Sequence, residues 1–437
     1  MSVSTANTGD APDAHTASYY AATANPSPDR PALVGEVTAE VCIIGAGFSG
    51  ISAALTLAEG GIASIVLEAK RVGWGASGRN GGQIVNGYSR DLSVIEGRYG
   101  RGPAKALADM SLEGGDIIRN RVTRYGIACD LVDGGFFAAL TPRQMRELEH
   151  VKRVWEGYGH TELEMVDRNR LPGIVQSDLY IGGQIDHRGG HIHPLNLVLG
   201  EAAAAESLGA TIHEGSAVTG IEDKGQEVLV HTAQGMVRAK TVLVCGNAYL
   251  GDAVPDLTNK IMPVSSQVVT TAPLDPALLD RLLPRNHCVE DCNYILDYYR
   301  RTADDRLLFG GGVVYGGTDP ASIEGKIRPH LERVFPALRG TKLDFAWSGN
   351  FALTMTRVPH VGRLSANVLF SHGDSGHGVT TTHLLGRLLG EAVIGRTERF
   401  DVFERLPYLP FPGGRALRVP LTVLGSWYYG LRDRLGV

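Results

Sequence analysis

The sequence predicts an α/β fold in which one domain, built on a parallel sheet, is interleaved with a second domain. Residues 40–68 have a strand–helix–strand pattern, and a further strand–helix junction returns at 366–394. Two strand-rich stretches, 130–186 and 263–346, lie between them. Because the first domain resumes after each stretch, we interpret both as insertions that together form the second domain.

The strand–helix–strand pattern contains the glycine-rich motif Gly-Ala-Gly-Phe-Ser-Gly at 45–50. An apolar strand precedes the motif, an amphipathic helix follows it, and a second apolar strand ends at Glu68. Gly45 permits a tight turn, Gly47 lets the backbone approach a pyrophosphate, and Gly50 lets the helix pack closely on the sheet. The carboxylate of Glu68 would accept hydrogen bonds from a ribose and repel a 2′-phosphate. The pattern therefore predicts a Rossmann-like dinucleotide-binding domain and disfavours NADP.

A second glycine-rich segment, residues 73–83, follows this acid. A nicotinamide enzyme normally continues directly into its next helix. The extra glycines indicate backbone wrapped around a longer cofactor, which favours FAD over NAD. A third glycine-rich junction, at 373–378, would bring another helix N-terminus beside this cofactor, where it could stabilise negative charge on a reduced flavin.

The composition restricts the class of protein. Glycine contributes 56 of the 437 residues, about twice its usual share. The formal net charge of −5 argues against nonspecific nucleic-acid binding, which needs a basic surface. Five scattered cysteines do not suggest a disulfide framework, and no apolar run is long enough to span a membrane. The N-terminus lacks the features of a signal peptide, so we expect a cytoplasmic protein.

The expected organisation follows from these patterns. An N-terminal extension is expected to be disordered as far as about Ser18. The C-terminal tail mixes Trp427 and Tyr428 with arginines, and we expect a helix packed on the body; the alternative is a membrane-surface or subunit contact, through which the protein could form oligomers. The expected boundaries are 1–35 for the N-terminal extension, 36–129, 187–262 and 347–400 for the FAD-binding domain, 130–186 and 263–346 for the substrate-binding domain, and 401–437 for the tail.

Several motifs resemble a known family. The motif at 45–50, the segment Gly-Trp-Gly-Ala-Ser-Gly-Arg-Asn-Gly-Gly-Gln at 73–83 and the run Ser-Gly-His-Gly-Val at 375–379 resemble the D-amino-acid-oxidase/glycine-oxidase superfamily of FAD oxidoreductases. Narrower stretches resemble the gamma-glutamylputrescine oxidases within it, at 189–197, 289–294, 297–300 and 347–351.

The resemblance implies an α/β fold in which FAD lies across the two glycine-rich strand–helix junctions, at 45–50 and 373–378. It also implies that an α+β substrate domain, built on a mainly antiparallel sheet, covers the flavin ring. It implies oxidation by O₂ of the free primary amine of gamma-glutamylputrescine to the aldehyde, with release of ammonia and hydrogen peroxide, as part of polyamine catabolism. One departure is Asp374, which stands where an aromatic residue often precedes the Ser-Gly-His-Gly run.

These motifs give the expected cofactor-binding residues. Nothing in the sequence marks a residue for covalent attachment, so we expect releasable FAD. The set is Gly45, Ala46, Gly47, Phe48, Ser49, Gly50, Glu68, Ala69, Lys70, Gly75, Ala76, Ser77, Arg79, Asn80, Gly81, Gly82, Gln83, Val218, Gly246, Asn247, Gly373, Asp374, Ser375, Gly376, His377, Gly378 and Val379.

The substrate site is expected around a tyrosine-rich strand at 294–300. Strand alternation puts Tyr294, Tyr298 and Arg300 on one face, and one aromatic face should point at the flavin. The flavin carries the chemistry, so no catalytic residue is assigned, but the amine must be neutral when it reacts. The candidates for substrate contact are Tyr294, Tyr298 and Tyr299, with Trp347 as a second wall, Arg300 or Arg301 for a carboxylate, and Glu290, Asp291 or Asp297 for an ammonium group.

Other interpretations stay open at this point. His187, His191 and His193, like the pair Cys288 and Cys292, lack the further ligands of a metal site, so no metal is expected. The enzyme could instead be a sarcosine- or glycine-type amino-acid oxidase, which would need an arginine beside the ring. It could be an amine dehydrogenase with an acceptor other than oxygen, or a flavin-binding module without catalysis.

Overall fold

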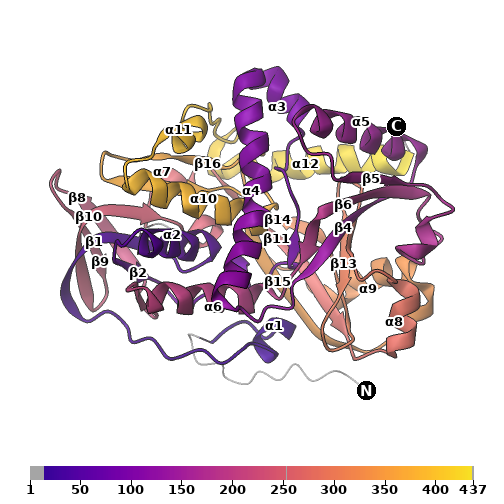
Figure 1. The fold of residues 1–437 in the computed structure, drawn as a ribbon, viewed down its shortest axis with the longest axis horizontal. Helices are drawn as coiled ribbons and strands as arrows, with labels where there is room; N and C mark the ends of the chain where they lie inside the picture. Colours follow the sequence, from indigo (N-terminus) through magenta and orange to yellow (C-terminus); the bar gives the residue numbers. More distant parts are fainter. Residues whose placement is uncertain (1–13, 252, 436–437) are drawn as a thin grey trace.

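Two β-sheets form the frame of the molecule. Figure 1 shows them in the two halves of the view, with the long helix α4 (Arg101–Tyr125) running between them. The computed structural model describes residues 14–251 and 253–435. The mixed α/β fold agrees with the prediction.

The first sheet has the strand order β16–β17–β10–β1–β2–β7, and β9 and β8 extend it from β10. The strands β17, β10, β1, β2 and β7 are parallel to one another, whereas β16, β9 and β8 pair in the antiparallel sense. The strand bounds are β1 (Gly35–Ile44), β2 (Ser64–Leu67), β7 (Thr211–His213), β8 (Val218–Asp223), β9 (Val228–Thr232), β10 (Gly235–Val244), β16 (His360–Arg363) and β17 (Val368–His372).

The central strand β1 is buried on both faces. Val41 and Ile43 pack into the core formed with the helices α2 (Phe48–Glu59), α6 (Pro194–Ser207) and α10 (Gly378–Val393). Cys42 and Ile44 point the other way, into a core with β9 and α7 (Pro255–Thr258). Burial on both faces explains why the sequence of β1 is a continuous apolar run, with Cys42 fully buried in it.

The second sheet has the order β15–β11–β14–β13–β12–β4–β6–β3, with β5 paired to β6. Among the described strands of this sheet, β4 and β12 alone pair in parallel, so the expectation of a mainly antiparallel sheet is confirmed. The bounds are β3 (Gln83–Ile84), β4 (Val132–Ala139), β5 (Leu163–Val166), β6 (Gly182–His191), β11 (Met262–Thr271), β12 (Cys288–Asp291), β13 (Asp297–Arg301), β14 (Leu307–Tyr315) and β15 (Leu343–Leu353).

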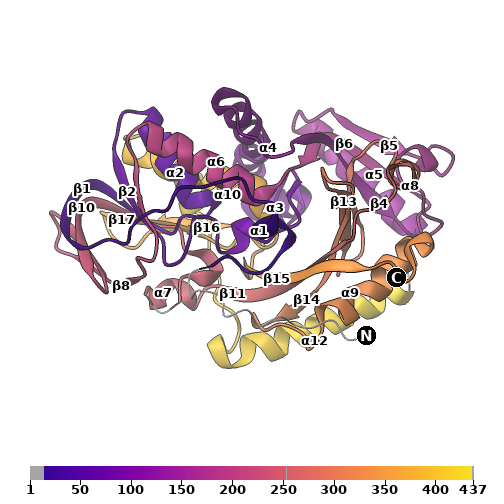
Figure 2. The same cartoon turned by 90° about the horizontal axis from the view of Figure 1, so that it is seen from below.

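Helices cover this sheet as well. Figure 2 shows α9 and the C-terminal helix α12 along the side of β14. The remaining helices lie at the N-terminus, beside α4, around β5 and β12, and after α10. The bounds are α1 (Tyr19–Ala22), α3 (Leu92–Tyr99), α5 (Pro142–Gly157), α8 (Pro276–Leu282), α9 (Ile323–Val334), α11 (Glu398–Glu404) and α12 (Gly414–Leu435).

Two strands run across the expected domain boundaries. β6 continues past residue 187, and β15 passes through residue 347, so the sheet carries the chain from one unit into the other without a loop at either point. The expected domain boundaries themselves stay a prediction.

The two ends of the chain are built onto the body. The expectation of disorder as far as Ser18 is wrong for residues 14–18: Trp74 Nε1 donates to Ala14 O at 2.9 Å, and the Ser18 hydroxyl caps α1. Residues 1–13 lie outside the described residues. α12 packs through Val419 against a cluster of β11 and β15, as expected for a helix on the body. Within the described parts of the chain, no helix is both long and apolar enough to cross a membrane.

Candidate active site

A large cavity of about 1040 Å³ lies where the two sheets meet. The loops that follow the parallel strands β1, β2, β10 and β17 line it from one side, and β11, β13, β14 and β15 line it from the other. The carboxyl ends of parallel strands share one edge of a sheet, which explains why segments distant in sequence meet here.

The turn from β1 into α2 is built from glycines for steric reasons. Gly45 has φ +100°, and a Cβ on Gly50 would lie 1.9 Å from Gly45 O, so the helix sits directly on the turn. Gly47 is the N-cap residue of α2 and has no side chain that could accept a hydrogen bond from the helix amides. A Cβ on Gly47 would lie 2.9 Å from Ser77 Oγ, which accepts a hydrogen bond from Phe48 N. Ser77 thus binds the amide of Phe48, and the next two amides of α2, those of Ser49 and Gly50, have no side-chain partner among the described residues, which suits an anion.

Glu68 stands at the end of β2 and lines the same cavity. One carboxylate oxygen accepts from Ala46 N at 2.8 Å and the other from Lys70 N at 2.9 Å. Burial raises the pKa of Glu68, although these backbone donors act in the opposite direction. The side chain is thus fixed beside the β1–α2 turn, as a ribose-binding acid must be.

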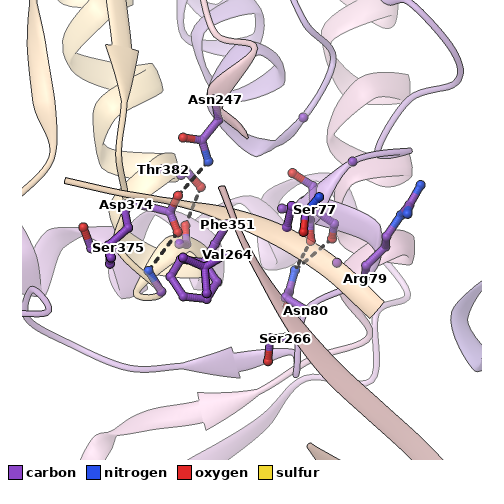
Figure 3. A pocket seen from close by; sticks show the side chains of 18 of the residues that line it. Ser77, Arg79, Asn80, Asn247, Val264, Ser266, Phe351, Asp374, Ser375 and Thr382 are labelled. Atoms are coloured by element: carbon purple, nitrogen blue, oxygen red, sulfur yellow. Dashed lines mark hydrogen bonds between the residues drawn. The ribbon is translucent and has the colours of Figure 1, made fainter. Parts of the chain in front are cut away.

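The glycine-rich loop at 73–83 is held in place by its own side chains. Asn80 Nδ2 donates to Ala76 O and Ser77 O, each at 3.0 Å, and its Oδ1 accepts from Gly82 N. The Arg79 guanidinium lies 4.1 Å from the centre of the Trp74 ring. Arg79 Nη2 is buried and has no hydrogen-bond partner among the described residues. Figure 3 shows Ser77, Arg79 and Asn80 together on one side of the cavity.

Asp374 and Asn247 join the ends of β17 and β10 on the opposite side (Figure 3). Asn247 Nδ2 donates to Asp374 Oδ1 at 2.6 Å, and Asn247 Oδ1 accepts from Gly373 N at 2.9 Å. Gly376 N donates to the second Asp374 oxygen at 3.3 Å. Burial raises the pKa of Asp374. The departure from the aromatic pattern therefore has a structural role, since this carboxylate fixes the turn that begins α10.

Nearly all the expected cofactor residues line the cavity. The exceptions are Ala46, Gly50, Gly82 and Gly373, which support the lining from behind. Ala46 and Gly373 donate their N–H groups to Glu68 and Asn247, and Gly82 backs onto Ile192 O, where a Cβ would come within 2.3 Å. The cavity therefore brings the glycine-rich strand–helix junctions at 45–50 and 373–378 to one continuous surface.

Three of the expected substrate residues line the cavity: Glu290, Tyr294 and Tyr298. The Tyr298 ring packs over the glycine-rich loop, since a Cβ on Gly81 would lie 2.6 Å from it. Burial, with a smaller contribution from the charge of Asp291, raises the pKa of Glu290 to about 7. No hydrogen-bond donor among the described residues reaches its carboxylate. An unpaired carboxylate on a cavity wall is suited to a cation from a ligand.

The other substrate candidates do not reach the cavity, and this corrects the expectation. The predicted strand at 294–300 is shorter, with β13 beginning at Asp297, and its second face is buried. Tyr299 stacks on Phe309 in the core, and Asp297 binds His330 and Arg333 of α9 at 2.8 and 3.0 Å. Arg301 pairs with Asp280, and Asp291 accepts a hydrogen bond from Asn293 N. The last two candidates are Arg300 and Trp347.

Arg300 and Trp347 hold the glycine-rich loop from behind instead. Arg300 Nε donates to Gly81 O at 2.8 Å and its Nη2 donates to Tyr20 OH at 3.0 Å. Trp347 Nε1 donates to Arg79 O at 2.9 Å. Both side chains thus position the loop without contacting the cavity.

The three histidines lie apart. His187 contacts Glu164, His191 contacts Asn286 O, and His193 caps α6 through Asn196 N. Each ring therefore has a structural partner of its own.

Among the charged residues that line the cavity, the sequence analysis missed Arg90 and Arg357. Both lie in irregular segments, where hydrophobic periodicity gives no information about orientation. Arg357 does carry a structural mark, a left-handed backbone at φ +62°, but the sequence around it gives no sign of this.

Comparison with known proteins places the chain. The model of the family described as "DAO: FAD dependent oxidoreductase" matches residues 40–392. The chain is 54% identical to the gamma-glutamylputrescine oxidoreductase of Escherichia coli, over 97% of this chain and 99% of that protein. It is 40% identical to a probable oxidoreductase of Haemophilus influenzae, over 96% and 98% of the two chains. Among solved structures, glycine oxidase from Geobacillus kaustophilus matches with a TM-score of 0.71 at 21% identity, covering 85% of this chain and 99% of that one. The chain belongs to the DAO family and is a FAD-dependent oxidoreductase.

Proposed function

We propose that this protein oxidises the free primary amine of gamma-glutamylputrescine to the aldehyde and releases ammonia and hydrogen peroxide. The observation that carries the proposal is the 54% identity, over nearly the whole of both chains, to the E. coli gamma-glutamylputrescine oxidoreductase. The cavity geometry is consistent with this substrate class, because its walls combine aromatic side chains with an unpaired carboxylate.

The residues that line the cavity fit FAD. The open N-terminus of α2 would hold the pyrophosphate, Glu68 the adenosine ribose, and the 75–83 loop with the N-terminus of α10 the ring. Two observations support this assignment: a Cβ on Gly47 would fill the approach to α2, and the buried Arg79 Nη2 is unpartnered among the described residues. When bound, FAD accepts a hydride equivalent from the carbon beside the amine nitrogen.

Glu290 would hold the amine end of the substrate. Its ionised carboxylate attracts the ammonium form, and one of its oxygens can accept the proton that the nitrogen must lose before oxidation. A carboxyl group with a pKa of about 7 is a better proton acceptor than an ordinary glutamate. Tyr294 and Tyr298 offer apolar ring faces to the methylene chain, and Val264, Phe351 and Leu353 reduce access of water.

We further propose O₂ as the electron acceptor, the cytoplasm as the compartment, and association of subunits through α12. The five cysteines are unpaired in the structure, which suits a reducing compartment. The outer face of α12 exposes Leu421, Leu424 and Trp427 at 44, 57 and 71%. An exposed apolar face of this kind is typical of a contact surface.

An aerobic product assay tests the proposed function. Holoenzyme is given gamma-glutamylputrescine, putrescine or sarcosine, and ammonia and hydrogen peroxide are measured. We expect equal amounts of both products and the highest kcat/KM with gamma-glutamylputrescine. A preference for sarcosine would identify an amino-acid oxidase. Turnover only with an artificial acceptor would identify a dehydrogenase, and no turnover under any condition would refute amine oxidation.

A further inference from the structure

Arg90 and Arg357 lie together on the cavity wall. Arg90 Nε donates to Thr356 O at 3.4 Å, so its guanidinium reaches the turn that carries Arg357. Arg357 Nη2 donates to Tyr294 OH at 3.4 Å. Neither guanidinium forms an ion pair with a carboxylate of the described residues. By contrast, Glu68 and Asp374 on the same cavity are fixed by hydrogen bonds within the protein.

The two arginines lie at an end of the cavity that opens to solvent. Tyr294 and Met355 both line the cavity and are 41 and 36% exposed. Glu290 lies on β12, an interior strand of the second sheet, and is less exposed than Tyr294 and Met355. The cavity therefore carries an unpaired negative group within its wall and two unpaired positive groups at its mouth.

The backbone at Arg357 is held in an uncommon conformation. A φ of +62° is unfavourable for a long side chain and persists only where surrounding contacts impose it. Thr354 on the same turn is tied to Ser375, with its hydroxyl donating to Val358 O at 2.9 Å. The turn thus fixes the backbone from which the Arg357 side chain reaches the cavity, and guanidinium groups are suited to binding carboxylates.

We infer that Arg90 and Arg357 form a carboxylate-binding subsite that selects amines bearing a carboxylate at the end remote from the reacting nitrogen. The inference rests on the proposed function and names its specificity residues. A gamma-glutamyl head group has this carboxylate, and putrescine does not. The amine end would lie toward Glu290 and the head group at the mouth, so the charges of substrate and cavity match along its length.

Paired substrates test this inference. Gamma-glutamylputrescine is compared with N-butyrylputrescine, which keeps the amide and the amine but lacks the carboxylate and the α-ammonium. The variants are Arg90→Gln, Arg357→Gln and the double variant, each checked for FAD content. The control is Arg405→Gln, an exposed arginine that does not line the cavity.

We expect each single variant to raise KM for gamma-glutamylputrescine about 10- to 100-fold with kcat unchanged, because a charge-assisted contact remote from the reacting carbon contributes uniform binding. KM for N-butyrylputrescine should not change. Gamma-glutamylethylamide, which has the head group without the reacting amine, should inhibit wild type competitively and the double variant weakly. Arg357→Lys should recover part of the loss.

Equal losses on both amines, or unchanged KM values in the double variant, would overturn the inference while the proposed function stands. Wild type that oxidises gamma-glutamylputrescine no better than N-butyrylputrescine would overturn the subsite alone. Wild type that does not oxidise gamma-glutamylputrescine would overturn the proposed function, and the subsite with it. A variant that loses FAD is replaced by its lysine counterpart, for which KM for gamma-glutamylputrescine should rise less than in the glutamine variants and KM for N-butyrylputrescine should not change. A large rise in KM for both amines would again count against the subsite.

Discussion

Replacing Glu290 by glutamine should lower activity and raise stability at the same time. Glu290 is half-buried on the cavity wall, its carboxylate has no hydrogen-bond donor among the described residues, and desolvation raises its pKa to about 7. Glutamine has nearly the same shape and cannot carry the charge. The variant therefore separates the role of the charge from the role of the side chain's volume.

The size of the stability effect follows from the pKa. The pKa of Glu290 rises from 4.5 to about 7, and at about 1.4 kcal/mol per pH unit this corresponds to about 3 kcal/mol at most. Because the folded state holds the proton more tightly than the unfolded state, the stability of wild type falls as pH rises through this window. The deficit is complete above pH 7, where Glu290→Gln should be the more stable protein.

The size of the kinetic effect follows from the lost contact. Loss of a charge-assisted contact to the substrate ammonium should lower kcat/KM about 10- to 100-fold at pH 8. In wild type kcat/KM should rise with pH around 7 as Glu290 ionises, and then further as the substrate amine loses its proton. The first rise should be absent in the variant.

Denaturant unfolding of the apoprotein at pH 5 and pH 8 measures the stability term, and pH profiles of kcat/KM measure the kinetic term. Asp291→Asn is the matched control. Burial also raises the pKa of Asp291 to about 7, but this side chain does not line the cavity, so its variant should keep the wild-type kinetic profile near pH 7. The reasoning is refuted if Glu290→Gln retains full kcat/KM and the same pH profile, or if it is less stable than wild type at pH 8.

Two further predictions concern the cofactor site and the helices behind it. Gly47→Val should weaken FAD binding at least tenfold, because even a Cβ would crowd Ser77 and the approach to α2; fluorescence titration of the apoprotein measures this, and Gly97→Ala, where a Cβ meets open space, should bind FAD normally. Arg121→Met should cost about 3–5 kcal/mol in denaturant unfolding, because Arg121 Nη1 lies 3.1 Å from Glu201 Oε1 with both side chains buried. The exposed pair of Lys105 with Asp109 provides the contrast, and Lys105→Ala should cost under about 1 kcal/mol. Equal losses of unfolding free energy for Arg121→Met and Lys105→Ala would contradict this account of the buried pair.

The cofactor half of the cavity could be predicted from sequence because its signals are local. The β1–α2 turn, the acid at 68 and the two glycine junctions each lie within a few residues of a strand end, and parallel strands bring such ends together. Asp374 was recognised as a departure, but its bond to Asn247 joins two strands far apart in sequence and could not be inferred from either segment.

The substrate half was predicted less well because its geometry is non-local. Alternation correctly separates Tyr298 from Tyr299, yet it does not tell which face meets a core and which meets a cavity. β6 has the sequence Gly-Gly-Gln-Ile-Asp-His-Arg-Gly-Gly-His, whose glycines hide the hydrophobic alternation of a strand. The stretch 130–186 was predicted to be rich in strands, but this strand was not identified within it or beyond its end. Arg90 and Arg357 meet only through the fold, in segments without periodicity.

The most direct test of the proposed substrate is the rate at which it reduces the bound flavin without oxygen. Holoenzyme is mixed anaerobically with gamma-glutamylputrescine, putrescine or sarcosine, and loss of the oxidised flavin absorbance is followed in a rapid-mixing instrument. The account predicts complete bleaching, fastest with gamma-glutamylputrescine, and return of the yellow colour with hydrogen peroxide when air is admitted. Faster reduction by sarcosine, or flavin that no amine reduces, would contradict it.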